Sequence, residues 1–247
     1  MAKTVLITGA GGGIGRELCK EFKAAGYRVI GIDHPSAPVV ENCDCIVSAD
    51  FTKLCRDTEY RVKIFNQLRS NLLNRSLKAL INNAAVQIIQ PTENLTVNQW
   101  HTTLDINLVA PFLLVQAFLN ELTQATGSVV NIASIHAKLT KPSFACYATS
   151  KAALVGLTQS LSIDLGGRVR INAIAPAAVS TSMLMAGFDD KPEAFQQLNQ
   201  MHPVGRIAVP KEIAQAALFL VSDQASFITG AVLEMDGGIR NRLYDPS

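Results

Sequence analysis

The chain has 247 residues, 48% of them hydrophobic and 17% charged, a composition that excludes disordered and fibrous proteins. Its 22 basic and 20 acidic residues leave a net charge of +2, too small to indicate binding to nucleic acid or to a membrane surface. The longest apolar stretch, residues 108–119, is too short to span a bilayer. Five cysteines, an odd number, without a signal-peptide pattern predict free thiols and a cytoplasmic location.

Short β-branched runs alternate with segments of helical periodicity along nearly the whole chain. The runs predict strands at residues 5–8, 29–33, 45–47, 79–81, 129–132, 169–172 and 231–234. Helices are expected from residue 14 to a stop at Gly26, and near 58–72, 105–120, 147–164 and 211–222. Strands that are apolar on both faces and alternate with helices predict a parallel sheet. We expect one α/β domain over residues 1–247, a Rossmann-type doubly wound sheet of about seven strands with helices on both faces.

Two of the predicted helices are more apolar than a surface helix should be. Gln116 is the only hydrogen-bonding side chain in residues 108–119, and residues 152–157 are similarly apolar. Such helices either lie deep in the core or meet another subunit. The second interpretation, which we favour, predicts a homo-oligomer.

A glycine-rich turn, residues 8–15, links the first predicted strand to the first helix. Without Cβ atoms, the backbone at Gly9, Gly13 and Gly15 can turn tightly and approach a pyrophosphate. The N–H groups at the start of the helix, beginning around Ile14, are free to bind that anion. The strand–turn–helix context predicts a dinucleotide site rather than a merely flexible turn.

An acidic residue, Asp33, ends the second predicted strand roughly 20 residues after the loop, the interval expected for a ribose-binding carboxylate. A carboxylate accepts hydrogen bonds from a free 2′-hydroxyl and repels a 2′-phosphate. Asp33 therefore predicts NAD rather than NADP as the cofactor. Arg16 is the nearby cation that could reach toward a 2′-phosphate, although we favour a solvated helix position for it.

Tyr147 and Lys151 lie four residues apart, a spacing that places them on one face of a helix. An ammonium group near a phenol favours tyrosinate, which can exchange a proton with an alcohol or carbonyl oxygen. Ser134 follows the fifth predicted strand, so it should lie at the carboxyl edge of the sheet, where its hydroxyl can donate to a substrate oxygen. No G-x-S-x-G turn surrounds Ser134, which argues against acyl-enzyme chemistry.

From about Lys3 to Gly238 the chain resembles the short-chain dehydrogenase/reductase family. The resemblance is carried by Thr8-Gly9-x-x-x-Gly13-Ile14-Gly15, Asn82-Asn83-Ala84-Ala85, Asn107, Ser134, Tyr147-x-x-x-Lys151, Asn172-Ala173-Ile174-Ala175-Pro176 and Asp236-Gly237-Gly238. The family pairs the two over-apolar helices between subunits, which implies a homo-oligomer, either a tetramer, which we favour, or a dimer.

The resemblance also implies roles for individual residues. Tyr147 would be the acid/base and Ser134 would orient the substrate oxygen. Lys151 would lower the pKa of the tyrosine and bond the nicotinamide ribose, and Asn107 would hold a water in a proton relay, unless it only bonds within a helix kink. The remaining cofactor contacts would come from Asp50 and Phe51 beside the adenine, Asn83 and Ala84 on the adenosine side, and Val179 and Thr181 at the carboxamide.

The chain departs from the family at two positions where glycine is usual, Ala85 and Ala177. A positive φ at either alanine would cost roughly 1 kcal/mol or more. Residues 182–203 correspond to the family's mobile substrate lid. The four histidines and the Cys43-Asp44-Cys45 run lack metal-ligand spacing, so no metal site is expected.

The leading hypothesis is an NAD-dependent oxidoreductase that interconverts a secondary alcohol and a carbonyl compound, with a small-molecule substrate that the sequence does not identify. A 3-oxoacyl-thioester reductase of the same family is the alternative enzyme, although Asp33 weighs against the NADP that such enzymes mostly use. A non-catalytic dinucleotide sensor is the alternative from another class, and the intact set of Ser134, Tyr147 and Lys151 weighs against it.

Overall fold

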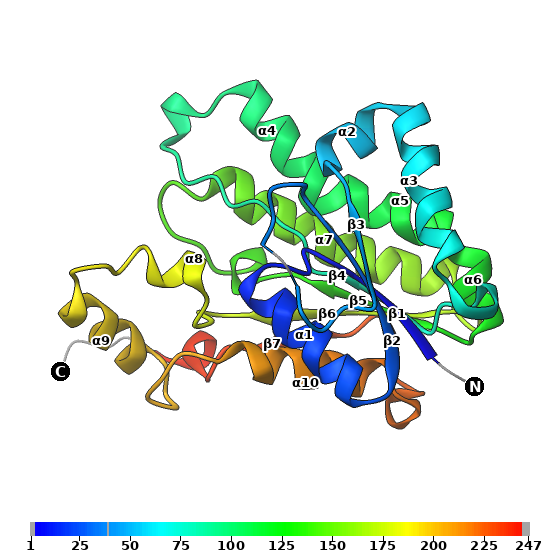
Figure 1. Cartoon of the computed structure of the whole chain (residues 1–247). Helices are drawn as coiled ribbons and strands as arrows, with labels where there is room; N and C mark the ends of the chain where they lie inside the picture. The colour runs from blue at the N-terminus through cyan, green and yellow to red at the C-terminus, as the bar shows by residue number, and fades with distance from the viewer. Residues whose placement is uncertain (1–2, 39, 244–247) are drawn as a thin grey trace.

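The computed structural model describes residues 3–38 and 40–243 and is built on one seven-stranded parallel sheet (Figure 1). The strand order is β3-β2-β1-β4-β5-β6-β7, and every neighbouring pair is parallel. The strands are β1 (Lys3–Thr8), β2 (Tyr27–Asp33), β3 (Cys45–Ser48), β4 (Ala79–Asn82), β5 (Ser128–Ile132), β6 (Arg170–Pro176) and β7 (Val232–Met235). All seven predicted strands are confirmed, with ends that differ by at most four residues.

The strand order reverses at β1, which pairs with β2 on one side and with β4 on the other. After β1 the chain moves outward to β2 and β3, and it then returns to β4 and continues to β7 in the opposite direction. Ligands of open α/β sheets bind at such a switch point, outside the carboxyl ends of the strands. The ends of β1 and β4 therefore mark where a ligand site is expected.

Helices cover both faces of the sheet, as predicted. On one face lie α1 (Gly13–Ala24) and α10 (Pro210–Val221), and on the other lie α2 (Phe51–Arg56), α3 (Thr58–Ser70), α4 (Val97–Leu104), α5 (Ala110–Ala117), α6 (Leu119–Gln124) and α7 (Ala145–Asp164) (Figure 1). Successive residues of β1 show why two layers form, because Val5 and Ile7 pack in the core under α1 and α10, whereas Leu6 packs in the core under α3 and α5.

The helix predicted over residues 105–120 is wrong as a single element. The chain there runs from α4 through a π-helical turn, Asp105–Val109, into α5, and a break at Phe118 separates α5 from α6. Three short helices were also missed, namely α2, α4 and α8 (Ser182–Met185), whereas α9 (Pro192–Met201) lies in the segment expected to form a lid. None of the described helices is long and apolar enough to cross a membrane.

Candidate active site

The glycine loop lies at the carboxyl end of β1, and its backbone is approached closely from two sides. Gly9 has a φ of +64°, and a Cβ atom there would lie 2.8 Å from the Cα of Ala84, beyond β4. A Cβ atom at Gly13 would lie 2.9 Å from Cγ2 of Thr181, which follows β6. One at Gly15 would lie 1.9 Å from the carbonyl oxygen of Gly9. The loop therefore admits only glycine at these positions.

Asn83 and Thr8 hold the end of β4 against this loop. The Asn83 side-chain amide donates to the carbonyl oxygens of Thr8 and Gly9, each at 3.0 Å. In return, the Thr8 hydroxyl oxygen accepts from the backbone N–H groups of Asn83 and Ala84, each at 2.9 Å. The structure thus brings together the sequence-predicted residues of the loop and of the motif after β4.

The N-terminal end of α1 fits a dinucleotide pyrophosphate. Gly12, at the N-cap, contributes no capping side chain, and the first turn carries no acidic residue that would repel an anion. Beside this turn, Oδ2 of Asp33 accepts a hydrogen bond from the Gly11 N–H at 2.7 Å. The carboxylate that should contact the ribose is therefore fixed against the loop that should contact the phosphates.

Arg16 is not simply a solvated helix residue. Its Nε donates to the carbonyl oxygen of Gly11 at 2.9 Å, so the guanidinium folds onto the glycine loop although the residue is exposed. Gly11 consequently bonds to both Asp33 and Arg16. A carboxylate and a guanidinium therefore both lie beside Gly11, where the 2′-hydroxyl of NAD or the 2′-phosphate of NADP would be expected.

The two alanines that replace the family's usual glycines cause no backbone strain. Neither Ala85 nor Ala177 has a positive φ. The energetic cost considered from the sequence therefore does not arise at either position. Ala85 is exposed, and the N–H of Ala177 donates to the carbonyl oxygen of Met235 at 3.0 Å.

Ser134, Tyr147 and Lys151 meet at the carboxyl end of β5. Ser134 follows the strand and is 7% exposed, and its oxygen accepts from the backbone N–H of His136 at 3.2 Å. Tyr147 and Lys151 project from the first two turns of α7, as their spacing predicts. Burial raises the pKa of Tyr147, and a hydrogen bond from Ser134 opposes this rise.

Lys151 is buried near Tyr147, and its side chain bonds to the end of β5. The Nζ of Lys151 donates to the carbonyl oxygen of Ile132 at 2.7 Å and lies 5.7 Å from the centroid of the tyrosine ring. The lysine is 2% exposed, and this burial lowers its own pKa to about 7. Near neutral pH the Lys151 amine is thus only partly protonated. It bonds to the strand rather than to the phenol.

Asn107 lies in the π-helical turn between α4 and α5 and is fully buried. Its side-chain oxygen accepts from the N–H of Val86 at 2.9 Å, and its nitrogen donates to the Val86 carbonyl at 3.0 Å and to the Ser150 hydroxyl at 2.9 Å. The amide therefore links the segment after β4 to the residue next to Lys151. These hydrogen bonds lie at the kink of the helix, and they also place Asn107 near Lys151, the predicted catalytic lysine.

The other predicted cofactor residues lie at the same edge of the sheet. Asp50 caps α2 by accepting from the Lys53 N–H at 3.1 Å, and the Phe51 ring is buried in the core. Val179 is 7% exposed, and Thr181 caps α8 through its hydroxyl.

A cluster of rings around Tyr147 was not fully anticipated. The His136 ring stacks on Phe144 with centroids 4.6 Å apart and meets Tyr147 edge-on at 5.8 Å. Neither His136 nor Phe144 was among the residues predicted to form the site. The available signal was that Phe144 precedes Tyr147 by three residues, one turn of a helix.

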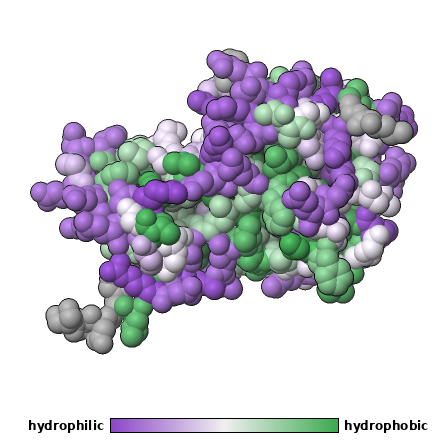
Figure 2. Space-filling view, turned by 90° about the horizontal axis from the view of Figure 1, so that it is seen from below, coloured by the Kyte–Doolittle hydropathy of each residue, from purple (hydrophilic) through white to green (hydrophobic). Residues whose placement is uncertain are grey.

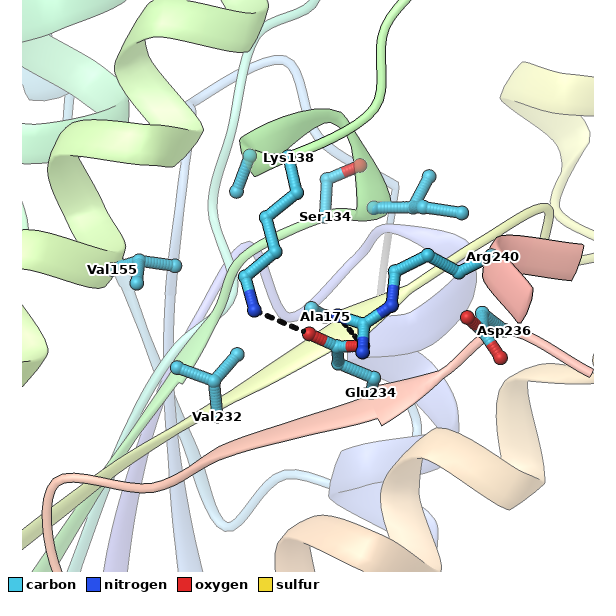
Figure 3. Close-up of a pocket in the computed structure, with 10 residues that line it drawn as sticks. Ser134, Lys138, Val155, Ala175, Val232, Glu234, Asp236 and Arg240 are labelled. Atoms are coloured by element: carbon cyan, nitrogen blue, oxygen red, sulfur yellow. Dashed lines mark hydrogen bonds and ion pairs between the residues drawn. The ribbon is translucent and has the colours of Figure 1, made fainter. Parts of the chain in front are cut away.

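A small pocket lies next to Ser134, between the turn that follows β5 and strand β7 (Figure 3). Lys138 and Arg240 both pair with the carboxylate of Glu234, with Nζ of Lys138 2.9 Å from Oε1. The Ser134 hydroxyl points away from Glu234 (Figure 3). This ion cluster therefore ties the Ser134 turn to the sheet edge from the side opposite the hydroxyl.

A glycine loop at a topological switch point, with a serine, a tyrosine and a lysine at the neighbouring strand end, defines a nicotinamide-dinucleotide oxidoreductase. The family model described as enoyl-(acyl carrier protein) reductase matches residues 9–240. The chain belongs to the short-chain dehydrogenase/reductase family, and it is an oxidoreductase.

Two curated relatives illustrate the similarity. Protein FixR of Bradyrhizobium diazoefficiens is 35% identical over 249 residues, which cover 96% of this chain and 86% of FixR. Galactitol 2-dehydrogenase (L-tagatose-forming) of Cereibacter sphaeroides is 33% identical over 236 residues, which cover 94% of this chain and 92% of that enzyme. The second name describes a dehydrogenase of a secondary alcohol.

Solved relatives have the same fold and hold either form of the cofactor. The 4-hydroxyisoleucine dehydrogenase complexed with NADH is 29% identical, with a TM-score of 0.86 over 98% of this chain and 100% of that one. A putative NAD(P)-dependent gluconate 5-dehydrogenase from Beutenbergia cavernae, with bound NADP, is 32% identical, with a TM-score of 0.87 over 98% of each chain. Both relatives bind a nicotinamide cofactor, but only the NADP of the second carries a 2′-phosphate.

Proposed function

We propose that this protein is an NAD-dependent dehydrogenase that interconverts a small-molecule secondary alcohol and its ketone, with Tyr147 as the acid/base. The observation that carries the proposal is that Ser134 follows β5 while the buried Lys151, one turn after Tyr147 in α7, bonds to the last residue of the same strand. A bound nicotinamide would supply the hydride acceptor or donor. The chain would supply the proton transfer and the alignment of the substrate oxygen.

The raised pKa of Tyr147 defines the protonation state from which it acts. With a pKa above its ordinary value, the phenol is protonated at neutral pH, so it is ready to donate a proton to a carbonyl oxygen. Oxidation of an alcohol requires the phenolate, so this direction should be favoured at alkaline pH. Ser134 hydrogen bonds with Tyr147, which places its hydroxyl to contact the same substrate oxygen.

Lys151 and Asn107 would support this proton transfer. A lysine with a pKa of about 7 can exchange a proton near neutral pH, and it lies one turn after the tyrosine. Asn107 bonds to Ser150, the neighbour of Lys151, and so fixes the start of α7. The proposed water relay would begin at Lys151, with Asn107 as the residue that holds its path in place.

The proposed preference for NAD rests on Asp33. Its carboxylate is held beside the glycine loop by the 2.7 Å bond to Gly11, where it would accept hydrogen bonds from a ribose 2′-hydroxyl. The proposed dinucleotide contacts are Gly9, Gly13, Ile14, Gly15, Asp33, Asp50, Phe51, Asn83, Ala84, Tyr147, Lys151, Val179 and Thr181. Arg16, on the same loop, would moderate the discrimination against NADP.

Residues 182–203 form the proposed substrate lid. They include α8 and α9, which project from the body of the molecule beyond the ends of the strands (Figure 1). No residue of α9 is buried, although Phe188 and Phe195 pack together with ring centroids 5.8 Å apart. A segment that buries so little surface against the sheet can move at low cost, as a lid must.

We also propose a homotetramer in the cytoplasm. Large hydrophobic side chains are exposed on α5 at Phe112 (38%), on α7 at Ile163 (83%) and after α10 at Phe227 (103%). Figure 2 shows hydrophobic surface across much of the face on the α10 side. Apolar surface of this extent supports contact with further subunits. Five free thiols support a reducing compartment.

The proposal is tested by screening secondary alcohols with NAD at alkaline pH and following the absorbance of the reduced cofactor. The expected result is turnover of at least one alcohol, with NADP a poorer acceptor. Arg16, folded onto the glycine loop, favours a 3-oxoacyl-thioester reductase that uses NADPH as the second candidate, so the panel includes a 3-oxoacyl thioester with NADPH. Turnover of the thioester alone would replace the proposed function with this second one.

A further inference from the structure

Two cysteine side chains meet behind the glycine loop. Cys19 lies in α1 and is fully buried, whereas Cys43 lies in the turn before β3 and is half-buried. Their sulfur atoms are 3.3 Å apart, within hydrogen-bond distance for thiols. A disulfide bond is about 2.05 Å long, so little more than 1 Å of movement would bring the sulfurs to bonding distance. Neither cysteine takes part in the proposed dehydrogenase chemistry.

The two thiols differ in reactivity, which a redox-active pair requires. A hydrogen bond from Cys19 lowers the pKa of the Cys43 thiol, and Lys23 adds to this effect while burial and Asp44 oppose it. The same hydrogen bond, together with burial, raises the pKa of Cys19. Cys43 therefore has the greater thiolate character and the better access to solvent. Cys19 stays protonated and is positioned to attack a neighbouring oxidised sulfur.

The pair is packed against the proposed dinucleotide site. A Cβ atom at Gly31, in β2, would lie 3.0 Å from Sγ of Cys43 and 2.9 Å from Cβ of Ala10, so both groups pack on the bare backbone of that strand. Ala10 belongs to the glycine loop. A Cβ atom at Gly11 would likewise lie 3.1 Å from the carbonyl oxygen of Pro38, which belongs to the same connection as Cys43.

We propose that Cys19 and Cys43 form a redox-active dithiol that a hydroperoxide oxidises to a reversible disulfide, and that this disulfide weakens NAD binding at the adjacent loop. The second part of this proposal, the weaker binding of NAD, rests on the proposed function. With hydrogen peroxide, the Cys43 thiolate attacks one oxygen, the O–O bond breaks, and sulfenic acid and hydroxide form. Hydroxide takes a proton to become water.

The second step closes the disulfide. The sulfur of Cys19 attacks the sulfur of the Cys43 sulfenic acid, the S–O bond breaks, and the departing oxygen leaves as a second water with the thiol proton of Cys19. The two thiols lose two electrons, which the peroxide gains. A small-molecule dithiol reverses the reaction by thiol–disulfide exchange.

The expected effect on NAD follows from where the movement must occur. Cys19 is held in a packed helix, so Cys43 and the connection after β2 have to move. That connection begins at Asp33 and contacts Gly11, the two residues joined by the 2.7 Å hydrogen bond. A shift there misplaces the carboxylate relative to the glycine loop, and NAD should bind more weakly.

The test oxidises the full-length protein with hydrogen peroxide, maps cross-linked peptides by mass spectrometry without reductant, and measures NAD binding by calorimetry. Cys43→Ser removes the proposed nucleophile, and Cys45→Ser is the matched control two residues away. We expect a Cys19–Cys43 linkage in the unaltered protein and in Cys45→Ser, but not in Cys43→Ser. The dissociation constant of NAD should rise at least about threefold on oxidation and return after reduction.

Two results would overturn the proposal. One is oxidation that yields no Cys19–Cys43 linkage, and the other is a mapped linkage that leaves the dissociation constant of NAD unchanged or lowers it. Failure of the reduced protein to bind NAD would instead refute the proposed function. In that case the linkage map still tests the dithiol, because it does not depend on the cofactor.

Discussion

Replacing Asn107 with alanine should destabilise the protein through three specific hydrogen bonds. The change leaves the N–H and carbonyl of Val86 and the hydroxyl of Ser150 without their partner in a fully buried site. Each lost bond costs about 1 kcal/mol, and more where the remaining group stays unsatisfied. We therefore expect the free energy of unfolding to fall by about 3 kcal/mol. For a chain of this size that corresponds to a decrease of roughly 6–12 °C in Tm.

Asn172→Ala is the matched control for this prediction. Asn172 is also fully buried, and its amide bonds to the Ile228 carbonyl at 2.9 Å and to the Ala231 N–H at 3.0 Å, away from the tyrosine and lysine. Thermal unfolding followed by circular dichroism should show losses of similar size for both variants. Only Asn107→Ala should also lower turnover. An unchanged Tm for Asn107→Ala would refute the reasoning that its amide cross-links the site.

Three further predictions follow from the site and the surface. Asp33→Ala should weaken NAD binding by about 1.5–3 kcal/mol and strengthen NADP binding, because Arg16 remains on the loop. Titration with both cofactors measures this change, and a preference of the unaltered protein for NADP would contradict the prediction. The Lys151 pKa of about 7 lies below its ordinary 10.5, so between these pH values the unfolded chain binds a proton that the folded one lacks. The free energy of unfolding of the unaltered protein should therefore rise with pH relative to Lys151→Met, by up to about 1.4 kcal/mol per pH unit, in denaturant titrations; a constant difference would contradict the burial argument. Light scattering at micromolar concentration should show a tetramer, and a stable monomer would exclude it.

Much of the fold was predictable because β-branched runs apolar on both faces are a strong signal for central parallel strands. The helical segment around Asn107 was predicted as one uninterrupted helix because apolar periodicity does not register a π-helical turn, which depends on the bonds of Asn107 to Val86 and Ser150. Helix α2 was missed because its six residues are too few to show a helical repeat in the sequence.

For the site, motif spacing gave the positions of the residues but not their ionisation. The i, i+4 spacing placed Tyr147 and Lys151 on one helix face, yet the pKa of each is shifted by burial, which depends on how other elements pack around α7. The same limit applies to Cys19 and Cys43. Their sulfurs meet only because α1 and the turn before β3 pack on the same side of β2.

Tyr147→Phe tests the proposed mechanism most directly. The variant keeps the ring and its contacts with His136 and Phe144 but removes the only group proposed to exchange a proton with the substrate oxygen. NAD affinity and steady-state turnover are measured on the same preparation with any alcohol found in the screen. We predict little change in the dissociation constant of NAD and a fall in turnover of about 10²–10⁴-fold. Undiminished turnover with intact NAD binding would contradict the assignment of Tyr147 as the acid/base.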